Sequence, residues 1–185
     1  MNRSLVITRY ATALLKYVKE TGGGDAVLKE AETLVKALEE VPEFTRAVGS
    51  VDILPDRKKE VLVRSALGGS ISPEMDRFVK LLMRNSRIAL LPDMLRHFIL
   101  MYYASIGKRK VHLTLSRPAT DVEMDRFARL VKAKTGDEPI FEVEVNPGLI
   151  GGFVLDLEDT ILDASIQRQL QIIREQFIER NRRIV

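Results

Sequence analysis

The chain of 185 residues contains no cysteine and no tryptophan, and it has only two histidines. The lack of cysteine excludes disulfides and metal sites with thiolate ligands. His97 and His112 fall on different predicted elements, and the sequence contains neither a His-x-x-x-His nor a Glu-x-x-His pair. A structural zinc or di-iron site is therefore not indicated, and each histidine is better explained as a surface or boundary residue.

Long apolar runs are also missing from the sequence. No stretch approaches the ~20 apolar residues that a membrane-spanning helix needs. Near the N-terminus, Arg9, Tyr10 and Lys16 interrupt the apolar residues, a pattern unlike that of a secretory signal. We therefore expect a cytosolic protein that reaches a membrane only indirectly, through partners.

Motifs for catalysis and cofactor binding are absent from the sequence. No Gly-x-Ser-x-Gly elbow presents a nucleophile. The glycine run at residues 22–24 lacks the Gly-Lys-Ser/Thr ending of a phosphate loop and follows no predicted strand. Asp156, Glu158, Asp159 and Asp163 do not follow the EF-hand pattern, and a solvated corner with a helix cap explains them better. We expect no enzyme activity, no cofactor and no metal.

Charge is unevenly distributed along the chain. Residues 1–110 carry 19 Lys or Arg and 13 Asp or Glu, whereas residues 111–185 carry 10 and 13. This asymmetry has two alternative explanations. Either the two parts of the chain have solvated surfaces of different composition, or they are two domains that face partners of different charge. The basic clusters at residues 108–110 and 180–183 lack interleaved aromatic side chains, so nucleic-acid binding is not favoured.

Helical periodicity dominates residues 1–106. Apolar stripes and their start and stop signals predict helices over about residues 6–20, 26–41, 42–49, 54–67, 73–84 and 92–106. Ser72 is the expected N-cap of the fifth helix, with Pro73 at its first position. Six helices with short connections predict an antiparallel bundle.

Residues 107–185 show a different period. Strands are predicted over residues 111–115, 141–145 and 153–157, and helices over residues 121–135 and from about residue 164 onward. The turn at residues 146–148 predicts that the last two strands form a hairpin. Gly151 and Gly152 indicate a bulge or a close backbone approach, and Asp163 is the expected N-cap of the last helix. The predicted fold is thus mainly α, a six-helix bundle followed by a small α+β domain.

The first and fifth predicted helices carry more apolar surface than one packing face needs. One explanation is that both helices are central in the bundle. The other is that a groove between them accepts an amphipathic helix from a partner. If the groove is correct, a charged residue at Ala11 or Leu82 should weaken partner binding and leave the bundle folded.

Three collinear segments resemble one protein family. The most specific is the C-terminal segment, with residues 150–153 (Ile-Gly-Gly-Phe), the acidic turn at residues 158–159, and residues 161–166 (Ile-Leu-Asp-Ala-Ser-Ile) leading to Leu170. Residues 9–14 and 78–98 give supporting matches, with Ser86 where the family usually has glycine. In order and spacing these segments are similar to the delta subunit of F-type ATP synthase, called OSCP in mitochondria.

The resemblance implies a non-catalytic stator subunit on the cytoplasmic face of the cell membrane, which resists rotor torque during proton-driven ATP synthesis. It implies that residues 1–106 bind the N-terminal helix of an alpha subunit and that residues 107–185 bind the C-terminal ends of the peripheral-stalk b subunits. The candidate contacts for the alpha-subunit helix are Ile7, Tyr10, Ala11, Leu14, Leu15, Val79 and Leu82. The alternative is a helical adaptor protein with an unrelated amphipathic-helix partner.

Overall fold

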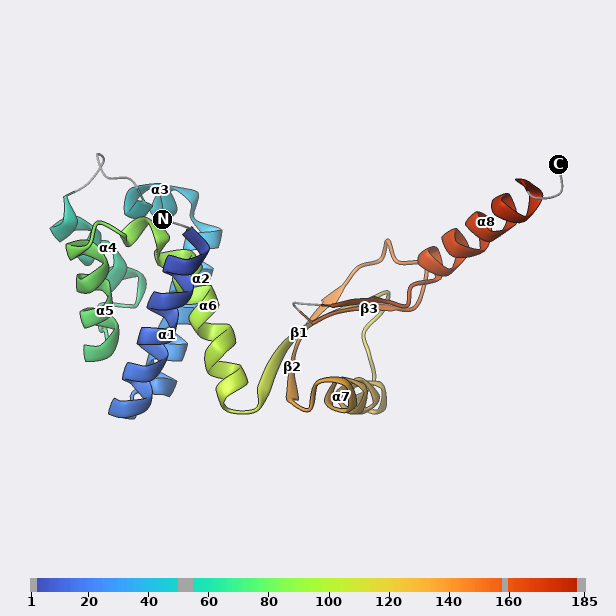
Figure 1. Ribbon diagram of the computed structural model, residues 1–185, viewed down its shortest axis with the longest axis horizontal. Coiled ribbons are helices and arrows are strands. Elements are labelled where there is room, and N and C mark those ends of the chain that lie inside the picture. The colour runs from blue at the N-terminus through green and yellow to red at the C-terminus, as the bar shows by residue number, and fades with distance from the viewer. Residues whose placement is uncertain (1–2, 50–54, 158–159, 183–185) are drawn as a thin grey trace. The chain divides into compact units, whose positions relative to one another are not determined.

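The computed structural model of the chain describes residues 3–49, 55–157 and 160–182 (Figure 1). The chain divides into two compact units, Met1–Ser105 and Ile106–Val185, one residue before the predicted boundary. The described residues are mainly helical, and the second unit adds a small four-stranded sheet. The predicted class, a mainly α chain with a small α+β part, is confirmed at this level.

The described part of the N-terminal unit consists of helices joined by short connections. These are α1 (Arg3–Thr21), α2 (Gly24–Glu40), α3 (Pro42–Gly49), α4 (Asp56–Ala66), α5 (Pro73–Arg84), the 3₁₀ turn η1 (Ile88–Leu90) and α6 (Leu91–Ser105). Leu54, which the sequence places at the opening of the fourth helix, lies outside the described residues. The helix α6 makes its most extensive contacts with α1 and α2 and buries Met94, Leu95 and Phe98 completely. It is therefore the centre of this unit's core.

The helix α5 begins at a capped and anchored end, as the sequence predicts. The hydroxyl of Ser72 accepts the backbone N–H of Met75 at 3.2 Å, and Pro73 occupies the first turn. The carboxylate of Glu30, on α2, accepts both the N–H and the hydroxyl of Ser72 at 2.6 Å. These bonds satisfy donors that a helix start would otherwise leave unpaired, and they fix α5 to α2.

We expect Ser72→Ala to lower the free energy of unfolding of the N-terminal unit by about 1–2 kcal/mol, because it removes the cap and one bond to Glu30. Urea unfolding followed by circular dichroism at 222 nm measures this loss. Ser65→Ala, at an exposed position on α4, is the matched control and should stay within about 0.5 kcal/mol of the parent. Equal midpoints for the two variants would show that the cap contributes nothing.

The C-terminal unit is built on a mixed sheet of four strands. Its elements are β1 (Lys108–Leu115), α7 (Asp121–Thr135), β2 (Glu138–Val145), β3 (Phe153–Asp156), β4 (Ile161–Asp163) and α8 (Ile166–Arg182). The strand order is β2-β1-β3-β4, with β1 parallel to β2 and antiparallel to β3. The helix α7 makes the crossover that a parallel pair requires, and it packs on the apolar face of the sheet through Phe127 and Val131.

Two sequence predictions are wrong in this unit, and one strand was missed. The predicted hairpin is wrong, because β1 lies between the second and third predicted strands. The strand β4 was not predicted and pairs with β3. Asp163 is not the N-cap of α8: the hydroxyl of Ser165 accepts the N–H of Arg168, while Asp163 accepts the N–H of Ser165. The acidic turn at residues 158–159 lies outside the described residues.

The predicted close backbone approach at the glycine pair is confirmed. Gly152 has a φ of +85°, and a Cβ at this position would lie 2.3 Å from the carbonyl oxygen of Ala164. Backbone bonds hold the two segments together, from the N–H of Ala164 to the oxygen of Phe153 and from the N–H of Ile166 to the oxygen of Gly151. The glycine pair therefore lets the chain before β3 lie directly against the start of α8.

The helix α8 leaves an apolar stripe uncovered within the described residues of its unit. Its members follow at i, i+4, i+7 and i+11, with exposed fractions of 40% for Ile166, 55% for Leu170, 48% for Ile173 and 67% for Phe177. Such a stripe is normally buried against another element. It is a surface on which a further helix can pack.

Candidate partner-binding groove

An apolar groove lies between α1 and α5 in the N-terminal unit. It has a volume of about 270 Å³ and is lined by Ala13, Leu14, Tyr17, Arg77, Phe78 and Leu81. The two helices touch each other far less than α1 touches α6, so that a channel stays open between them. A polar contact crosses it at the rim, where Arg77 Nη1 donates to Tyr17 Oη at 2.5 Å.

Of the seven predicted contact residues, four are buried under the groove and three lie at the edge of the core. Ala11, Val79 and Leu82 are at most 1% exposed and belong to the core. Leu14 is 2% exposed and forms the floor of the groove. Contrary to the prediction from sequence, we therefore expect a charge at Ala11 or Leu82 to destabilise the bundle, since either change buries a charge without a partner.

The other three predicted residues are half-buried and pack on the core from its edge. They are Ile7, Tyr10 and Leu15. Tyr10 marks one end of the α1–α5 pair: its hydroxyl accepts from Asn85 Nδ2 at 3.0 Å, and the guanidinium of Arg87 lies 5.3 Å from its ring centre. Ser86, between these two partners, has a φ of +53°, a left-handed conformation that glycine adopts at lower cost.

The groove residues missed by the prediction were visible in the sequence as part of the same apolar arcs. Ala13 and Tyr17 follow one helical stripe of α1, and Phe78 and Leu81 belong to the wide apolar surface of α5. The sequence does not specify which side of the apolar surface of α1 or of α5 faces α6. In the structure the deeper part packs on the core, and Leu81, 44% exposed, is left on the surface.

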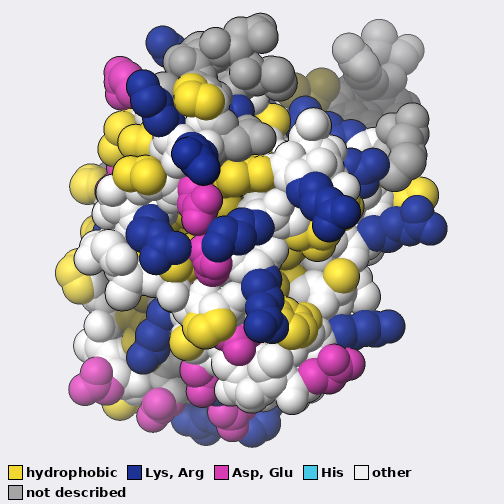
Figure 2. All heavy atoms as spheres, turned by 90° about the vertical axis from the view of Figure 1, so that its left-hand side faces the viewer, with side chains coloured by type: hydrophobic (Ala, Val, Ile, Leu, Met, Phe, Trp, Pro, Cys, Tyr) yellow, Lys and Arg dark blue, Asp and Glu magenta, His cyan; other side chains and the backbone are white. Residues whose placement is uncertain are grey.

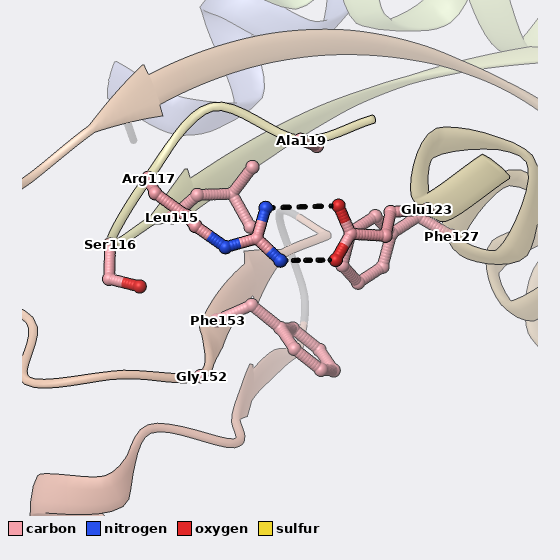
Figure 3. A pocket seen from close by; sticks show the side chains of 8 residues that line it. All are labelled: Leu115, Ser116, Arg117, Ala119, Glu123, Phe127, Gly152 and Phe153. Carbon is pink, nitrogen blue, oxygen red and sulfur yellow. Dashed lines mark hydrogen bonds and ion pairs between the residues drawn. The ribbon is translucent and has the colours of Figure 1, made fainter. Parts of the chain in front are cut away.

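A second, smaller pocket of about 190 Å³ lies in the C-terminal unit, where β1 ends and α7 begins. Figure 3 shows the guanidinium of Arg117 facing the carboxylate of Glu123 across it. The two make a bidentate pair at 2.7 and 3.2 Å, and Glu123 also accepts the N–H and hydroxyl of Thr120 in a capping box. The two charged groups of this pocket thus pair with each other, and together with Thr120 they fix the start of α7.

These donors lower the pKa of Glu123 to about 2: the bonds from Arg117 act most, followed by those from Thr120. The ionised form is therefore favoured in the folded state, and its stabilising effect is lost as pH falls from the ordinary pKa of 4.5 towards 2. We expect Glu123→Gln to be less stable than the parent at pH 7 and the difference to shrink over this window. Urea midpoints at pH 7, 4 and 2.5 test this, with Glu144→Gln at an exposed site as control. A difference that is independent of pH would contradict it.

Metal ligation finds no support in the part of the chain that the structure describes. No group of three or more His, Asp or Glu side chains there is placed to hold an ion. His112 Nδ1 lies 3.1 Å from Glu142 on the solvated face of the sheet. None of the described helices combines the length and apolar character needed to cross a membrane.

An apolar groove on one unit and an uncovered apolar helix on the other fit the class of binding proteins that dock helices. The sequence family described as ATP synthase delta (OSCP) subunit matches residues 6–177. The chain belongs to this family, whose members are non-catalytic subunits of the F-type ATP synthase, and the prediction of no enzyme activity is confirmed on this ground.

Relatives match the chain over nearly its whole length. The ATP synthase subunit delta of Phocaeicola vulgatus is 33% identical, with 98% of each chain covered. That of Bacteroides fragilis is 31% identical over the full length of both. A chain in the structure of the Toxoplasma gondii mitochondrial ATP synthase hexamer superposes with a TM-score of 0.73 at 18% identity and covers 93% of this chain and 97% of its own. At this low sequence identity, the structural similarity shows that the two chains share a fold.

Proposed function

We propose that the chain links the catalytic head of an F-type ATP synthase to its peripheral stalk and resists rotor torque. In this role the N-terminal unit acts as an antiparallel six-helix bundle and holds the N-terminal helix of an alpha subunit. The C-terminal unit holds the C-terminal ends of the b subunits. The observation that carries the proposal is the apolar α1–α5 groove in a chain of this family. In this role the protein binds its partners and catalyses no reaction.

The groove suits an amphipathic helix in size and lining. The helix α5 has 12 residues and so offers a wall of about 18 Å, the length of three helical turns. Ala13 permits a close backbone approach on one side, and Phe78 and Leu81 supply apolar contact on the other. A partner helix would fill this channel with side chains at i, i+4 and i+7.

The stripe on α8 supports the second interface of the proposal. The spacing of Ile166, Leu170, Ile173 and Phe177 is that of a heptad seam. A stalk made of helices can complete such a seam with its own apolar positions, and burial of these side chains would supply the driving force. Through these partners the chain would lie at the cytoplasmic face of the membrane without entering it.

Calorimetric titration with a synthetic peptide of the alpha subunit's N-terminal ~20 residues from the same source tests the proposal, since this length exceeds three helical turns. We expect saturable one-to-one binding with a negative heat-capacity change, because apolar surface is buried. Leu81→Glu should weaken this binding by at least about tenfold, because it places a charge on the groove wall without disturbing the core.

Val61→Glu, at a 62%-exposed apolar position on α4, is the matched control and should bind like the parent. Absence of binding by the folded parent chain would overturn the alpha-subunit contact. It would favour the helical adaptor with an unrelated partner instead. Equal losses in both variants would show that the contact lies outside the groove.

A further inference from the structure

We propose that the open edge of β2 in the C-terminal unit binds an extended segment of a partner protein, which adds a further strand to the sheet. In this segment apolar residues alternate with Lys or Arg. Its backbone pairs with Phe141, Val143 and Val145, and its basic side chains face Glu142 and Glu144. The edge shares no residue with the α1–α5 groove or with the stripe on α8.

The strand β2 stands at one end of the strand order β2-β1-β3-β4, so that within the described part of the chain it pairs with β1 alone. The N–H of Glu138 donates to the oxygen of Gly107, and the N–H of Asn146 donates to the oxygen of Leu115. Successive residues of a strand direct their N–H and C=O groups to opposite sides. The even-numbered residues of β2 therefore face β1, and the odd-numbered residues face the open edge.

The open edge can accept a further strand between residues 141 and 145. Pro139 has no N–H and ends the usable edge on one side. Phe141, Val143 and Val145 each direct one donor and one acceptor outward. Lysine, which often protects an edge, is absent from β2, and the charged residues of this strand are all glutamates. The opposite edge is β4, which has only three residues.

The side chains of the same three residues lie on the apolar face of the sheet. In the register with β1, Phe141 lies beside Val111 and Val143 lies beside Leu113, and both of these neighbours are completely buried. Val143 and Val145, in contrast, are 47% and 43% exposed, so that α7 leaves this end of the face uncovered. A further strand with apolar side chains at the matching positions would cover it.

The glutamates on the other face decide which strand can pair at this edge. Two copies of β2 related by a twofold axis can bond through all three outward residues only when Val143 lies opposite itself. Glu142 of each copy then lies opposite Glu144 of the other, at positions where facing side chains approach most closely. Like charges directly opposite each other are destabilising. The edge therefore disfavours a second copy of the chain and favours a strand with cations at these positions.

Both glutamates are accessible to such cations. Lys110 Nζ and His112 Nδ1, both on β1, lie 3.0 and 3.1 Å from carboxylate oxygens of Glu142, yet the Glu142 side chain is still 46% exposed. Glu144 is exposed, and its register partner is the neutral Thr114. Two carboxylates beside one lysine leave this part of the edge negative, which attracts Lys or Arg side chains on the incoming strand.

Basic side chains of the chain itself do not supply this strand. Figure 2 shows Lys and Arg side chains spread among apolar ones over the side of the N-terminal unit that carries α4 and α5. The backbone of a helix bonds to itself and cannot pair with a sheet edge. The basic residues of β1 already lie inside the sheet. The strand therefore comes from another protein.

NMR titration of the ¹⁵N-labelled full chain tests the proposal. The probe is the end-blocked peptide Ser-Gly-Val-Lys-Val-Lys-Val-Gly-Ser, and the matched control is Ser-Gly-Val-Glu-Val-Glu-Val-Gly-Ser. We expect saturable shifts of the β2 amides with the lysine peptide. Its affinity should be at least about tenfold higher than that of the glutamate peptide, because two attractive cross-strand pairs become repulsive in the control. Equal affinities, or no saturable shift in β2, would overturn the proposal.

Hydrogen exchange separates strand addition from charge attraction alone. In the free chain the amides of Phe141, Val143 and Val145 should exchange quickly, whereas those of Glu142 and Glu144, which bond to β1, should be protected. The bound lysine peptide should slow the three outward amides at least about tenfold and leave the two inward ones nearly unchanged. Binding without this protection would overturn strand addition. Outward amides protected in the chain alone, with a dimer mass in sedimentation, would make a second copy the occupant and overturn the proposal.

A charge-reversal pair tests the role of the two glutamates. Glu142→Lys combined with Glu144→Lys should reverse the preference, so that the glutamate peptide binds more tightly than the lysine peptide. Asp125→Lys with Glu175→Lys makes the same change in net charge at exposed positions on α7 and α8 and should keep the preference of the parent. Reversal in both double variants would show that net charge alone selects the peptide, and would overturn the proposal.

Discussion

Gly152→Val is expected to unfold the C-terminal unit. The left-handed φ of +85° alone costs a side chain about 1–2 kcal/mol. The new Cβ would also lie 2.3 Å from a carbonyl oxygen of the chain before α8, and this backbone is held by its own hydrogen bonds and cannot move aside. A clash of this kind adds about 1–3 kcal/mol or more. A unit of this size has only a few kcal/mol of stability, so loss of its dispersed NMR signals at 25 °C is the expected observation.

A matched pair of alanine variants separates the clash from the backbone strain. Gly136 ends α7 with a φ of +82°, but a Cβ there would meet nothing within 4 Å. Gly136→Ala should therefore cost only the strain, about 1–2 kcal/mol, whereas Gly152→Ala should cost clearly more. Hydrogen exchange of amides in β1 and β3 measures both losses in the full chain. Equal losses would mean that the contact with Ala164 is relieved by a small shift.

Local signals in the sequence were sufficient to predict the bounds of an element where its own residues determine where it begins and ends. The bounds of α3 and α7 and the cap of α5 follow from proline, glycine and capping residues, and the structure agrees with them. The stripe on α8 likewise follows from the spacing of its apolar residues at i, i+4, i+7 and i+11. In each case the relevant hydrogen bonds and periodicity lie within a few residues, and no knowledge of the neighbours is required.

The pairing of the strands could not be predicted from local sequence signals. The alternation of residues 141–145 and 153–157 and the turn between them are typical of a hairpin, yet β1 lies between these strands. The pairing is decided by the crossover through α7, which packs Phe127 and Val131 on the buried face of the sheet. The strand β4 has only three residues and depends on its partner β3, so that its own sequence carries almost no signal.

The groove lies between the two helices that the sequence singles out, and of the seven candidate residues Leu14 alone is among those that line it. Periodicity gives the width of an apolar arc, but the part that is covered depends on where α6 packs. The groove is therefore displaced from Ala11, Val79 and Leu82 to Ala13, Tyr17 and Leu81. The first three residues therefore support the core, and the last three are the side chains that we propose for partner contact.

Leu81 and Leu82 provide the sharpest test of that displacement. They are adjacent in α5, but Leu81 is 44% exposed on the groove wall and Leu82 is 0% exposed in the core. Leu82→Glu is expected to lower the free energy of unfolding of the N-terminal unit by about 4 kcal/mol or more, because it removes buried apolar contacts and buries a carboxylate without a partner. Thermal unfolding by circular dichroism, with hydrogen exchange in α6, locates the loss in this unit.

Leu81→Glu is expected to change the same free energy by no more than about 0.5 kcal/mol, because its side chain stays in water. The two variants add the same charge to the same helix one residue apart, so helix propensity and net charge cannot explain a difference between them. If Leu82→Glu unfolds the unit and Leu81→Glu does not, the loss of peptide binding in Leu81→Glu belongs to the groove itself. If both stay folded, Leu82 is not a core residue, and it becomes a candidate partner contact again, as the family resemblance implied.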